Sequence, residues 1–395
     1  MANIDRQIPA QQSSLSTVSR RSFLQTASAT VFAAGLAPAI LGADDKAGTK
    51  PVVIGDGDFQ FECHHNWGEV PEGITYKDTH GVTVDKDGLI YVKHRGNPDQ
   101  PCDTIVVFDP DGKCVRSFGE EYAGGGHGID IREEDGTEYL YLSDTYNRQA
   151  VKCDTQGEWL WKKRYPREAE TYDELTQFRP TNISFHPNGG FYVGDGYGSS
   201  YLHEYDKDAN WVRTWGGKGS EPGQMSTPHG QWLDDRPGRE PSIVVADRAN
   251  SRLQYFSLDG EPLAIMQGVN ELDHPSPTDE HLGARMKDYR DFPVEAVLPI
   301  SFPADVDIQG EYMLVPDLHA RLLIFNGKNE LVANIGYDPD WTQQVFADKF
   351  AMRGNPSQWQ EGRFVHPHDA CFDKDGNIYV TEWVAAGRVT FLRRV

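Results

Sequence analysis

The sequence predicts an all-β protein, a six-bladed β-propeller. Short runs of alternating apolar and polar residues are separated by Asp-Gly and Asn-Gly turns, and helical periodicity is almost absent, a pattern typical of consecutive β-hairpins. One unit with four strand patterns recurs six times, for example as "HGVTVDKDGLIYVKHRG" followed by "DTIVVFDPDGKCVRSFG". Such four-stranded repeats are typical of propeller blades. The first strands begin at equivalent positions, spaced by 47, 54, 48, 75 and 64 residues: His80, His127, Thr181, His229, Ala304 and His368.

The two ends of the repeat region are expected to close the ring. The sixth repeat has room for only three strands before Val395, whereas the strand pattern at 52–67 has no blade of its own. We therefore expect that N-terminal segment to supply the outer strand of the last blade, which would remove open sheet edges. The two longest repeats contain inserts without a strand pattern, near 269–300 and 337–363.

The first 43 residues form a separate region. Residues 19–24 read "SRRSFL" and are followed by an Ala-rich apolar run at 26–41 and a small-residue exit, "LGA". This is the pattern of a twin-arginine export signal. A membrane anchor is the alternative, but the run is shorter than the ~20 apolar residues of a membrane span. The sequence thus predicts an export signal at 1–43 and a propeller domain at 44–395, periplasmic or extracellular, with no membrane span.

Composition narrows the range of partners. The chain has 60 acidic and 38 basic residues, a net charge of −22, and such a surface repels nucleic-acid phosphates. Nucleic-acid binding is therefore not expected. The five cysteines form no CxxC pair, which disfavours a zinc-thiolate cluster. The mature chain is expected to be a monomer.

Histidines begin four of the six first strands, and these strands line the channel of a propeller. His127, His229 and His368 belong to blades 2, 4 and 6, which stand ~120° apart around a six-fold ring. Three neutral imidazoles that converge in this way suit a zinc ion with an open fourth position. His80, in blade 1, is expected to donate to a metal ligand or merely to line the channel. Each histidine taken singly is better explained as a strand residue bonded to backbone, and only the joint arrangement favours a metal.

The ends of the second strands face the same mouth of the channel. Most of them carry an Asp, which we expect to bond neighbouring turns. Arg95 in "HRG" and Tyr197 in "GDGYG" break the pattern of their repeats. An arginine fork suits a substrate carboxylate, and a tyrosine hydroxyl close to a zinc ion could act as a base.

These motifs together resemble a known family. The ordered set "HRG", "GHG", "GDGYG", "TPHG…ADRANSRLQYF" and "PHD" is similar to the peptidyl-α-hydroxyglycine α-amidating lyases, and the repeats resemble NHL-type propellers. The resemblance covers about 52–395. It implies zinc ligands at His127, His229 and His368, substrate recognition by Arg95 and catalysis by Tyr197.

The resemblance implies two further roles and shows three departures. Arg248 in "ADRANSR" matches a second active-site arginine. Asp369, directly after His368, resembles a side chain that reaches a structural calcium in the channel, completed by backbone carbonyls near Val82 and Ile129. The departures lie where the family has a methionine and two paired cysteines, at His366, Gly198 and Tyr255.

The resemblance implies a zinc-dependent lyase that cleaves the C–N bond of an N-acyl- or peptidyl-α-hydroxyglycine to an amide and glyoxylate. Its cofactors would be zinc and a structural calcium, and its substrate a small molecule or peptide with a carboxylate. Two alternatives stay open. One is a non-catalytic NHL propeller that binds or scaffolds, and the other is a metal-dependent, lactonase-like hydrolase.

Overall fold

The computed structural model describes residues 51–270, 292–296 and 299–395. The predicted export signal at 1–43 lies outside these residues, and so does most of the insert predicted near 269–300. The described residues of 44–395 fall within one compact unit. Among them, no helix is both long and apolar enough to cross a membrane.

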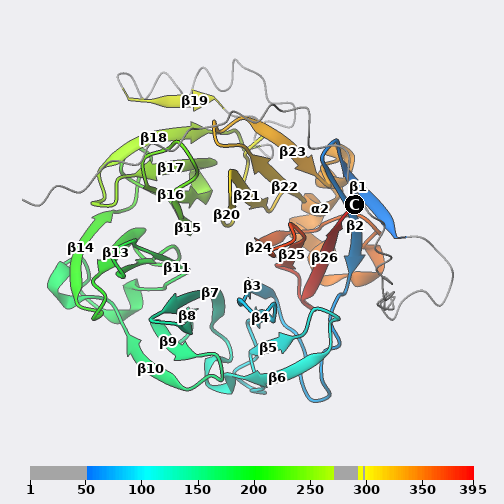
Figure 1. Ribbon diagram of the computed structural model, residues 1–395, viewed down its shortest axis with the longest axis horizontal. Helices are drawn as coiled ribbons and strands as arrows, with labels where there is room; N and C mark the ends of the chain where they lie inside the picture. Colours follow the sequence, from blue (N-terminus) through cyan, green and yellow to red (C-terminus); the bar gives the residue numbers. More distant parts are fainter. Residues whose placement is uncertain (1–50, 271–291, 297–298) are drawn as a thin grey trace, which may run out of the picture. The chain divides into compact units, whose positions relative to one another are not determined.

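Six antiparallel sheets stand in a ring around a channel, which confirms the predicted six-bladed β-propeller (Figure 1). Blade 1 contains β3 (Thr79–Val84), β4 (Ile90–His94), β5 (Ile105–Phe108) and β6 (Cys114–Phe118). Blade 2 contains β7 (Gly126–Glu134), β8 (Thr137–Asp144), β9 (Gln149–Asp154) and β10 (Trp159–Lys163). Blade 3 contains β11 (Asn182–Phe185), β12 (Phe191–Gly194), β13 (Tyr201–Tyr205) and β14 (Trp211–Gly216).

The other three blades follow the same order from the channel outward. Blade 4 contains β15 (Pro228–Asp234), β16 (Ser242–Asp247), β17 (Arg252–Phe256) and β18 (Pro262–Gln267), with β19 (Val294–Ala296) added in parallel. Blade 5 contains β20 (Asp307–Gln309), β21 (Tyr312–Asp317), β22 (Arg321–Phe325) and β23 (Leu331–Ile335). Blade 6 contains β24 (Pro367–Phe372), β25 (Ile378–Glu382) and β26 (Arg388–Arg394), completed by β2 (Phe59–His65) and β1 (Val52–Asp56).

Ring closure occurs as the sequence predicts. β2 pairs antiparallel with β26, from Phe61 opposite Arg394 to His65 opposite Thr390. The N-terminal strand therefore becomes the fourth strand of blade 6, and β1 adds a fifth. Phe61 is buried in a core cluster shared with blades 5 and 6, so the closure is held by apolar packing as well as by the backbone ladder.

Aspartates set the turns and hold the strand ends. Asp85, in the turn between β3 and β4, accepts hydrogen bonds from the backbone N–H groups of Asp87 and Leu89 (3.0 and 2.8 Å), a turn-stabilising pattern for this residue. The recurring acids at second-strand ends bond the loop before the first strand. Asp195 accepts from the amide of Arg179 (2.6 Å), and Glu382 accepts from Val365 (2.6 Å). Both bonds fix the loop that leads into the channel.

In the part of the chain that the structure describes, helices occur only in the connections between strands. The one α-helix in the described part of the chain is α2 (Pro339–Phe350), in the second predicted insert. Asp338 caps it by accepting from the Trp341 amide at 3.0 Å, and Pro339 occupies its first position, as helix starts favour. The 3-10 helices are η1 (Glu120–Tyr122), η2 (Arg167–Ala169), η3 (Leu175–Gln177), η4 (Arg248–Asn250), η6 (Ala351–Gly354) and η7 (Pro356–Gln358).

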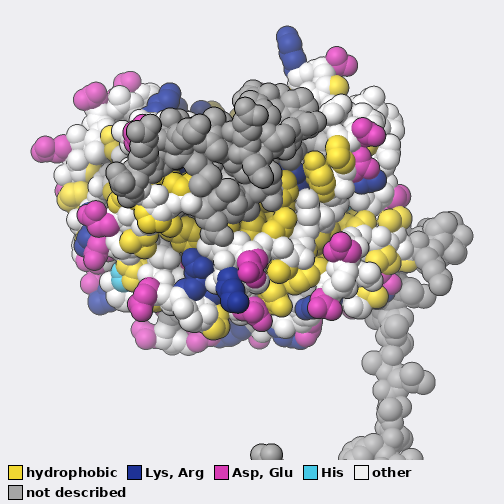
Figure 2. All heavy atoms as spheres, turned by 90° about the horizontal axis from the view of Figure 1, so that it is seen from above, with side chains coloured by type: hydrophobic (Ala, Val, Ile, Leu, Met, Phe, Trp, Pro, Cys, Tyr) yellow, Lys and Arg dark blue, Asp and Glu magenta, His cyan; other side chains and the backbone are white. Residues whose placement is uncertain are grey.

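Charged side chains of both signs lie on the described part of the surface. Figure 2 shows acidic and basic side chains interspersed with apolar ones over the described atoms of that face. This agrees with the net charge of −22. All five cysteines lie among the described residues, and none is paired with another.

Candidate functional site

Four histidine side chains meet in the channel. Each is the second residue of its strand: His80 of β3, His127 of β7, His229 of β15 and His368 of β24. Their ring centroids lie 4.4–5.0 Å apart for every pair in contact. All four are buried, with 1–2% of their surface exposed. The structure therefore brings together the three predicted ligands, and it places His80 among them.

A β-bulge aims each histidine at the axis. Between β7 and β8 the register jumps from Gly126 to Ile129, so His127 stands outside the ladder. The same irregularity skips His80, His229 and His368 in their own blades. Bulges redirect a side chain that the regular pleat would point elsewhere. The histidine and the residue after it can thus both serve the channel.

Glycine after the histidine lets neighbouring first strands approach. A Cβ on Gly81 would lie 2.8 Å from the carbonyl oxygen of His127, and one on Gly128 would lie 2.6 Å from that of Thr181. Such contacts are too short for a real side chain, so the "HG" dipeptides are a packing requirement of the narrow channel.

Backbone carbonyls fix the tautomer of each ring. The Nδ1–H of His127 donates to the Thr181 carbonyl (2.6 Å), that of His229 to Ala304 (2.7 Å) and that of His368 to His80 (2.9 Å). The Nδ1–H of His80 donates to the Gly126 carbonyl (2.9 Å). Because a carbonyl oxygen only accepts, each Nδ1 carries the proton and each Nε2 presents a lone pair. Metal-binding histidines are commonly oriented in this way.

Burial keeps the four rings neutral. It lowers the pKa of each imidazole well below its usual value, and neighbouring rings and arginines lower it further. A neutral imidazole is the form that binds a metal ion. The Nε2 atoms of His127 and His368 are buried without a hydrogen-bond partner among the described residues, a state that costs about 1–3 kcal/mol per group.

The histidine cluster therefore fits a divalent metal ion. Ligand nitrogens of His80, His127 and His368 lie within 4.8 Å of one another. The Nε2 of His229 instead accepts a hydrogen bond from the Tyr197 hydroxyl at 2.9 Å, and the Nε2 of His80 accepts one from Nη2 of Arg95 at 3.2 Å. Neutral nitrogen donors, fixed orientation and two unpartnered lone pairs are the properties of such a site.

The predicted tyrosine and arginines surround this cluster at second-strand ends. Tyr197 lies between β12 and β13, with its ring 5.1 Å from His127 and 5.2 Å from His229. Arg95 follows β4 directly, and Arg248 opens η4 after β16. The guanidinium of Arg248 lies over the Tyr197 ring at 5.3 Å. All three predicted residues thus belong to one side of the channel.

The guanidinium groups of Arg95 and Arg248 differ in their bonding partners. Nη1 of Arg95 pairs with Asp78 at 3.2 Å, and its Nη2 bonds His80. Asp78 is also paired with Arg353. Arg248 has no carboxylate partner among the described residues, and its Nε is buried without a hydrogen bond. Arg248 therefore offers the more available fork for a carboxylate.

His366, the residue at the methionine position, faces elsewhere. Its Nδ1–H donates to the Leu318 carbonyl at 2.9 Å. Its ring packs against Phe346, Phe350 and Trp383, with centroids 5.2–5.7 Å away. His366 thus belongs to an aromatic group formed with α2.

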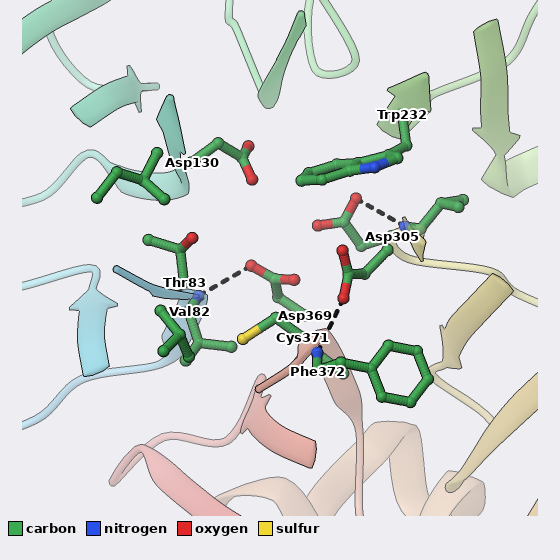
Figure 3. Close-up of a pocket in the computed structure, with 13 residues that line it drawn as sticks. Val82, Thr83, Asp130, Trp232, Asp305, Asp369, Cys371 and Phe372 are labelled. Atoms are coloured by element: carbon green, nitrogen blue, oxygen red, sulfur yellow. Dashed lines mark hydrogen bonds between the residues drawn. The ribbon is translucent and has the colours of Figure 1, made fainter. Parts of the chain in front are cut away.

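A second set of titratable groups lines a cavity of about 160 Å³ in the same channel. Figure 3 shows the carboxylates of Asp130, Asp305 and Asp369 turned toward it, with the Trp232 ring beside them. Asp307 also lines the cavity. Only Asp369 was predicted from the sequence. The others follow the first-strand starts by one or three residues, but no shared motif marks them.

The carboxyls of Asp130, Asp305 and Asp369 are buried, and that of Asp307 is half-buried. The charges of Asp305 and Asp369 are close enough to repel each other. Burial, followed by charge repulsion from its neighbours, raises the pKa of Asp305 well above its usual value. Burial raises the pKa of Asp369 to about 7 and that of Asp307 to about 6. One oxygen of Asp130 is buried with no partner among the described residues. Such an oxygen-rich set suits calcium.

The resemblance implies calcium at Asp369, whereas in this structure the carboxylates of Asp369 and Asp305 accept hydrogen bonds from the protein. The Asp369 carboxylate accepts a hydrogen bond from the Val82 N–H at 2.9 Å, and Asp305 accepts from the Asn182 amide at 2.9 and 3.1 Å. The calcium site at Asp369 stays a prediction, with Asp130, Asp305 and Asp307 as added candidates.

Comparisons with known proteins agree with the family suggested by the motifs. No family model matches the chain. A peptidyl-alpha-hydroxyglycine alpha-amidating lyase of Drosophila melanogaster is 23% identical over 322 residues, 76% of this chain and 50% of the relative. A probable lyase of the same name from Caenorhabditis elegans is 26% identical over 178 residues, 44% of this chain and 46% of the relative. The chain is thus similar, at 23–26% identity, to two proteins named as lyases of this kind.

A peptidylglycine alpha-amidating monooxygenase of Rattus norvegicus shares the similarity, with 27% identity over 249 residues. That match covers 56% of this chain and 24% of the rat protein. The chain thus spans about a quarter to a half of the length of these three lyase-related proteins.

Solved structures agree with the fold. A catalytically inactive virginiamycin B lyase from Staphylococcus aureus superposes with a TM-score of 0.52 at 10% identity, covering 85% of this chain and 100% of that one. A streptogramin B lyase gives a TM-score of 0.51 at 11% identity, covering 84% and 97%. These similarities establish the propeller architecture alone.

Calcium should stabilise the protein more at pH 7.5 than at pH 5. In the metal-free protein the pKa of Asp369 is raised to about 7, so protons must leave before calcium binds, and binding strengthens as pH rises. Calcium at 100 times its dissociation constant would add about 2.7 kcal/mol. Thermal unfolding after chelation, with and without added calcium, measures this shift. Asp369→Asn should abolish it, whereas equal shifts at both pH values would contradict the assignment.

Proposed function

We propose that this protein is a zinc-dependent lyase acting on N-acyl- or peptidyl-α-hydroxyglycines. The observation that carries the proposal is the convergence of neutral histidine nitrogens with the Tyr197 hydroxyl, 2.9 Å from the Nε2 of His229. Similarity to lyases of this name supports the same reaction. The carbon that bears the hydroxyl loses its bond to the amide nitrogen and becomes the aldehyde of glyoxylate. The hydroxyl proton ends on the released amide nitrogen.

His127, His229 and His368 would hold the zinc ion, with the open position for substrate. Zinc bound there would supply Lewis acidity toward the substrate hydroxyl. The residues of the chain then have separate tasks. Tyr197 lies against both His127 and His229, where its hydroxyl can relay a proton, passing its own to the departing nitrogen and taking the one from the substrate hydroxyl.

The substrate carboxylate would bind Arg248. This guanidinium lies over the Tyr197 ring at 5.3 Å and has no carboxylate partner among the described residues. Binding there places the reacting carbon beside the tyrosine oxygen. Arg95, which Asp78 and His80 already hold, would act as a second cation near the same carboxylate.

We also propose export by the twin-arginine route, on the strength of residues 19–24 and the apolar run that follows. The substrate would then be met outside the cytoplasm. A calcium ion bound by Asp369 would stabilise the channel next to the histidines.

Metal content followed by glyoxylate release tests the function. The protein from residue 44 onward should hold zinc and release glyoxylate from an N-acyl-α-hydroxyglycine. His229→Ala should lose most of both, because the change removes a ligand and the hydroxyl's acceptor. A panel of lactones and esters should give no turnover. Zinc-loaded protein that releases no glyoxylate from such substrates would contradict the proposal.

Tyr197→Phe should lower kcat by about 10²–10⁴-fold, the usual contribution of a general acid–base residue. The ring and its contacts with His127 and His229 remain, so KM and zinc content should change little. Steady-state kinetics with metal analysis of the same preparation check this. An unchanged kcat would remove Tyr197 from proton transfer.

Arg248→Gln should raise KM more than Arg95→Gln does. A hydrogen bond to a charged group contributes about 1.5–3 kcal/mol, or roughly 10–150-fold in binding. The loss should vanish for a substrate whose carboxylate is replaced by a carboxamide, because that substrate has no charge to pair. Equal penalties on both substrates would show that Arg248 does not contact the carboxylate.

A further inference from the structure

The proposed reaction gives no role to His80. Three-histidine coordination accounts for His127, His229 and His368, yet His80 is buried to the same degree, with 1% of its surface exposed. Its ring centroid lies 4.4 Å from that of His368 and 5.0 Å from that of His127. It has the same bulge, the same Nδ1–carbonyl bond and the same inward Nε2 as the other three.

The positions of the ring nitrogens favour His80 over His229 as a metal ligand. Ligand atoms of His80, His127 and His368 lie within 4.8 Å of one another. The Nε2 of His229 is turned toward the Tyr197 hydroxyl. The His229 ring also lies close to those of His127 and His368, with centroids 4.7 and 4.6 Å away.

We propose that His80 is a fourth protein ligand of the metal ion at this centre. The inference rests on the proposed metal site, and it extends that site to four imidazoles. Four neutral nitrogens suit a first-row divalent ion such as zinc, and the substrate oxygen would then be a fifth ligand, a coordination number that catalytic zinc can reach. The buried lone pair of His80 has a side-chain partner, Arg95, whose guanidinium is part of the mouth and 39% exposed at its side chain. Its hydrogen bond can be exchanged for a metal bond without leaving a buried group unsatisfied.

This assignment couples metal loading to the groups around the site. The Nε2 of His80 accepts a hydrogen bond from Arg95 at 3.2 Å, and the Nε2 of His229 accepts one from Tyr197 at 2.9 Å. A metal ion bound to both nitrogens would replace both hydrogen bonds. Nη2 of Arg95 and the hydroxyl of Tyr197 then become available to substrate.

The competing role for His80 is to position Arg95 by accepting its hydrogen bond. The two roles differ in measurable ways. A positioning residue changes KM and leaves the metal unaffected. A ligand changes metal affinity and the number of nitrogen atoms around the ion.

The experiment compares zinc-loaded wild type, His80→Ala and His80→Gln. X-ray absorption should count four imidazoles in wild type and three in each variant. Competition with a chromogenic chelator should show zinc affinity falling by more than the ~10–100-fold typical of changes outside the ligand set. Glutamine keeps an oxygen that can accept from Arg95, so retained affinity in His80→Gln with a changed KM only in His80→Ala would overturn the proposal.

His366→Ala provides the matched control. His366 is also 1% exposed, its Nδ1 bonds a backbone carbonyl, and its Nε2 has no partner among the described residues. It lies outside the four-histidine group, so its loss should leave zinc affinity and the imidazole count unchanged. Circular dichroism of the metal-free variants checks folding. A wild-type count of three imidazoles would contradict the role of His80 but not the lyase proposal. Zinc-loaded protein with four imidazoles that releases no glyoxylate would contradict the lyase proposal but not the role of His80.

Discussion

The channel depends on one repeated interaction, the hydrogen bond from a histidine Nδ1 to a backbone carbonyl of the next blade. Four such bonds, at 2.6–2.9 Å, join blade 1 to 2, 2 to 3, 4 to 5 and 6 to 1. Each joins neighbouring sheets, selects a tautomer and directs a lone pair toward the axis. The stability of the ring and the chemistry of the site therefore use the same atoms. The glycines at 81 and 128 belong to this constraint, because a side chain there would separate the strands that the bonds hold together.

The first strands create two successive layers of different chemistry. The bulge aims the histidine inward, and the regular strand that follows presents its next positions to the same channel. The first layer is neutral and nitrogen-rich, whereas the second contains Asp130, Asp305, Asp307 and Asp369. Nitrogen donors favour zinc and its neighbours in the first transition row, whereas carboxylates favour calcium. Two metal ions of different class could therefore be sorted within one channel, although His368 and Asp369 are adjacent in sequence.

The repeat pattern predicts the blade number, the closing strand and the four histidines of the channel, because one unit recurs six times along the chain. It also singles out Arg95 and Tyr197 at equivalent strand ends, whereas the role of Arg248 is implied by the resemblance. The contacts of the His80 ring with the rings of His127 and His368 could not be predicted from the spacing of the blades. That argument treats alternate blades as partners, but near the axis rings of adjacent blades are equally close, as His80 and His127 show at 5.0 Å. Of the acidic layer only Asp369 is implied by the resemblance, because Asp130 of blade 2 and Asp305 and Asp307 of blade 5 become its neighbours only when the ring closes.

The second insert, which has no strand pattern, connects physically with the site. Arg353 of η6 pairs with Asp78 and lies over the Trp383 ring at 3.7 Å. Asp78 in turn pairs with Arg95, which bonds His80. The insert is therefore linked by side-chain contacts to a histidine of the candidate metal centre. Removing Arg353 would leave Arg95 as the only cation paired with Asp78 among the described residues. Arg95 is thus linked through Asp78 to a segment that adds no strand to the blades but packs Trp341, Val345 and Met352 into the core of blades 5 and 6.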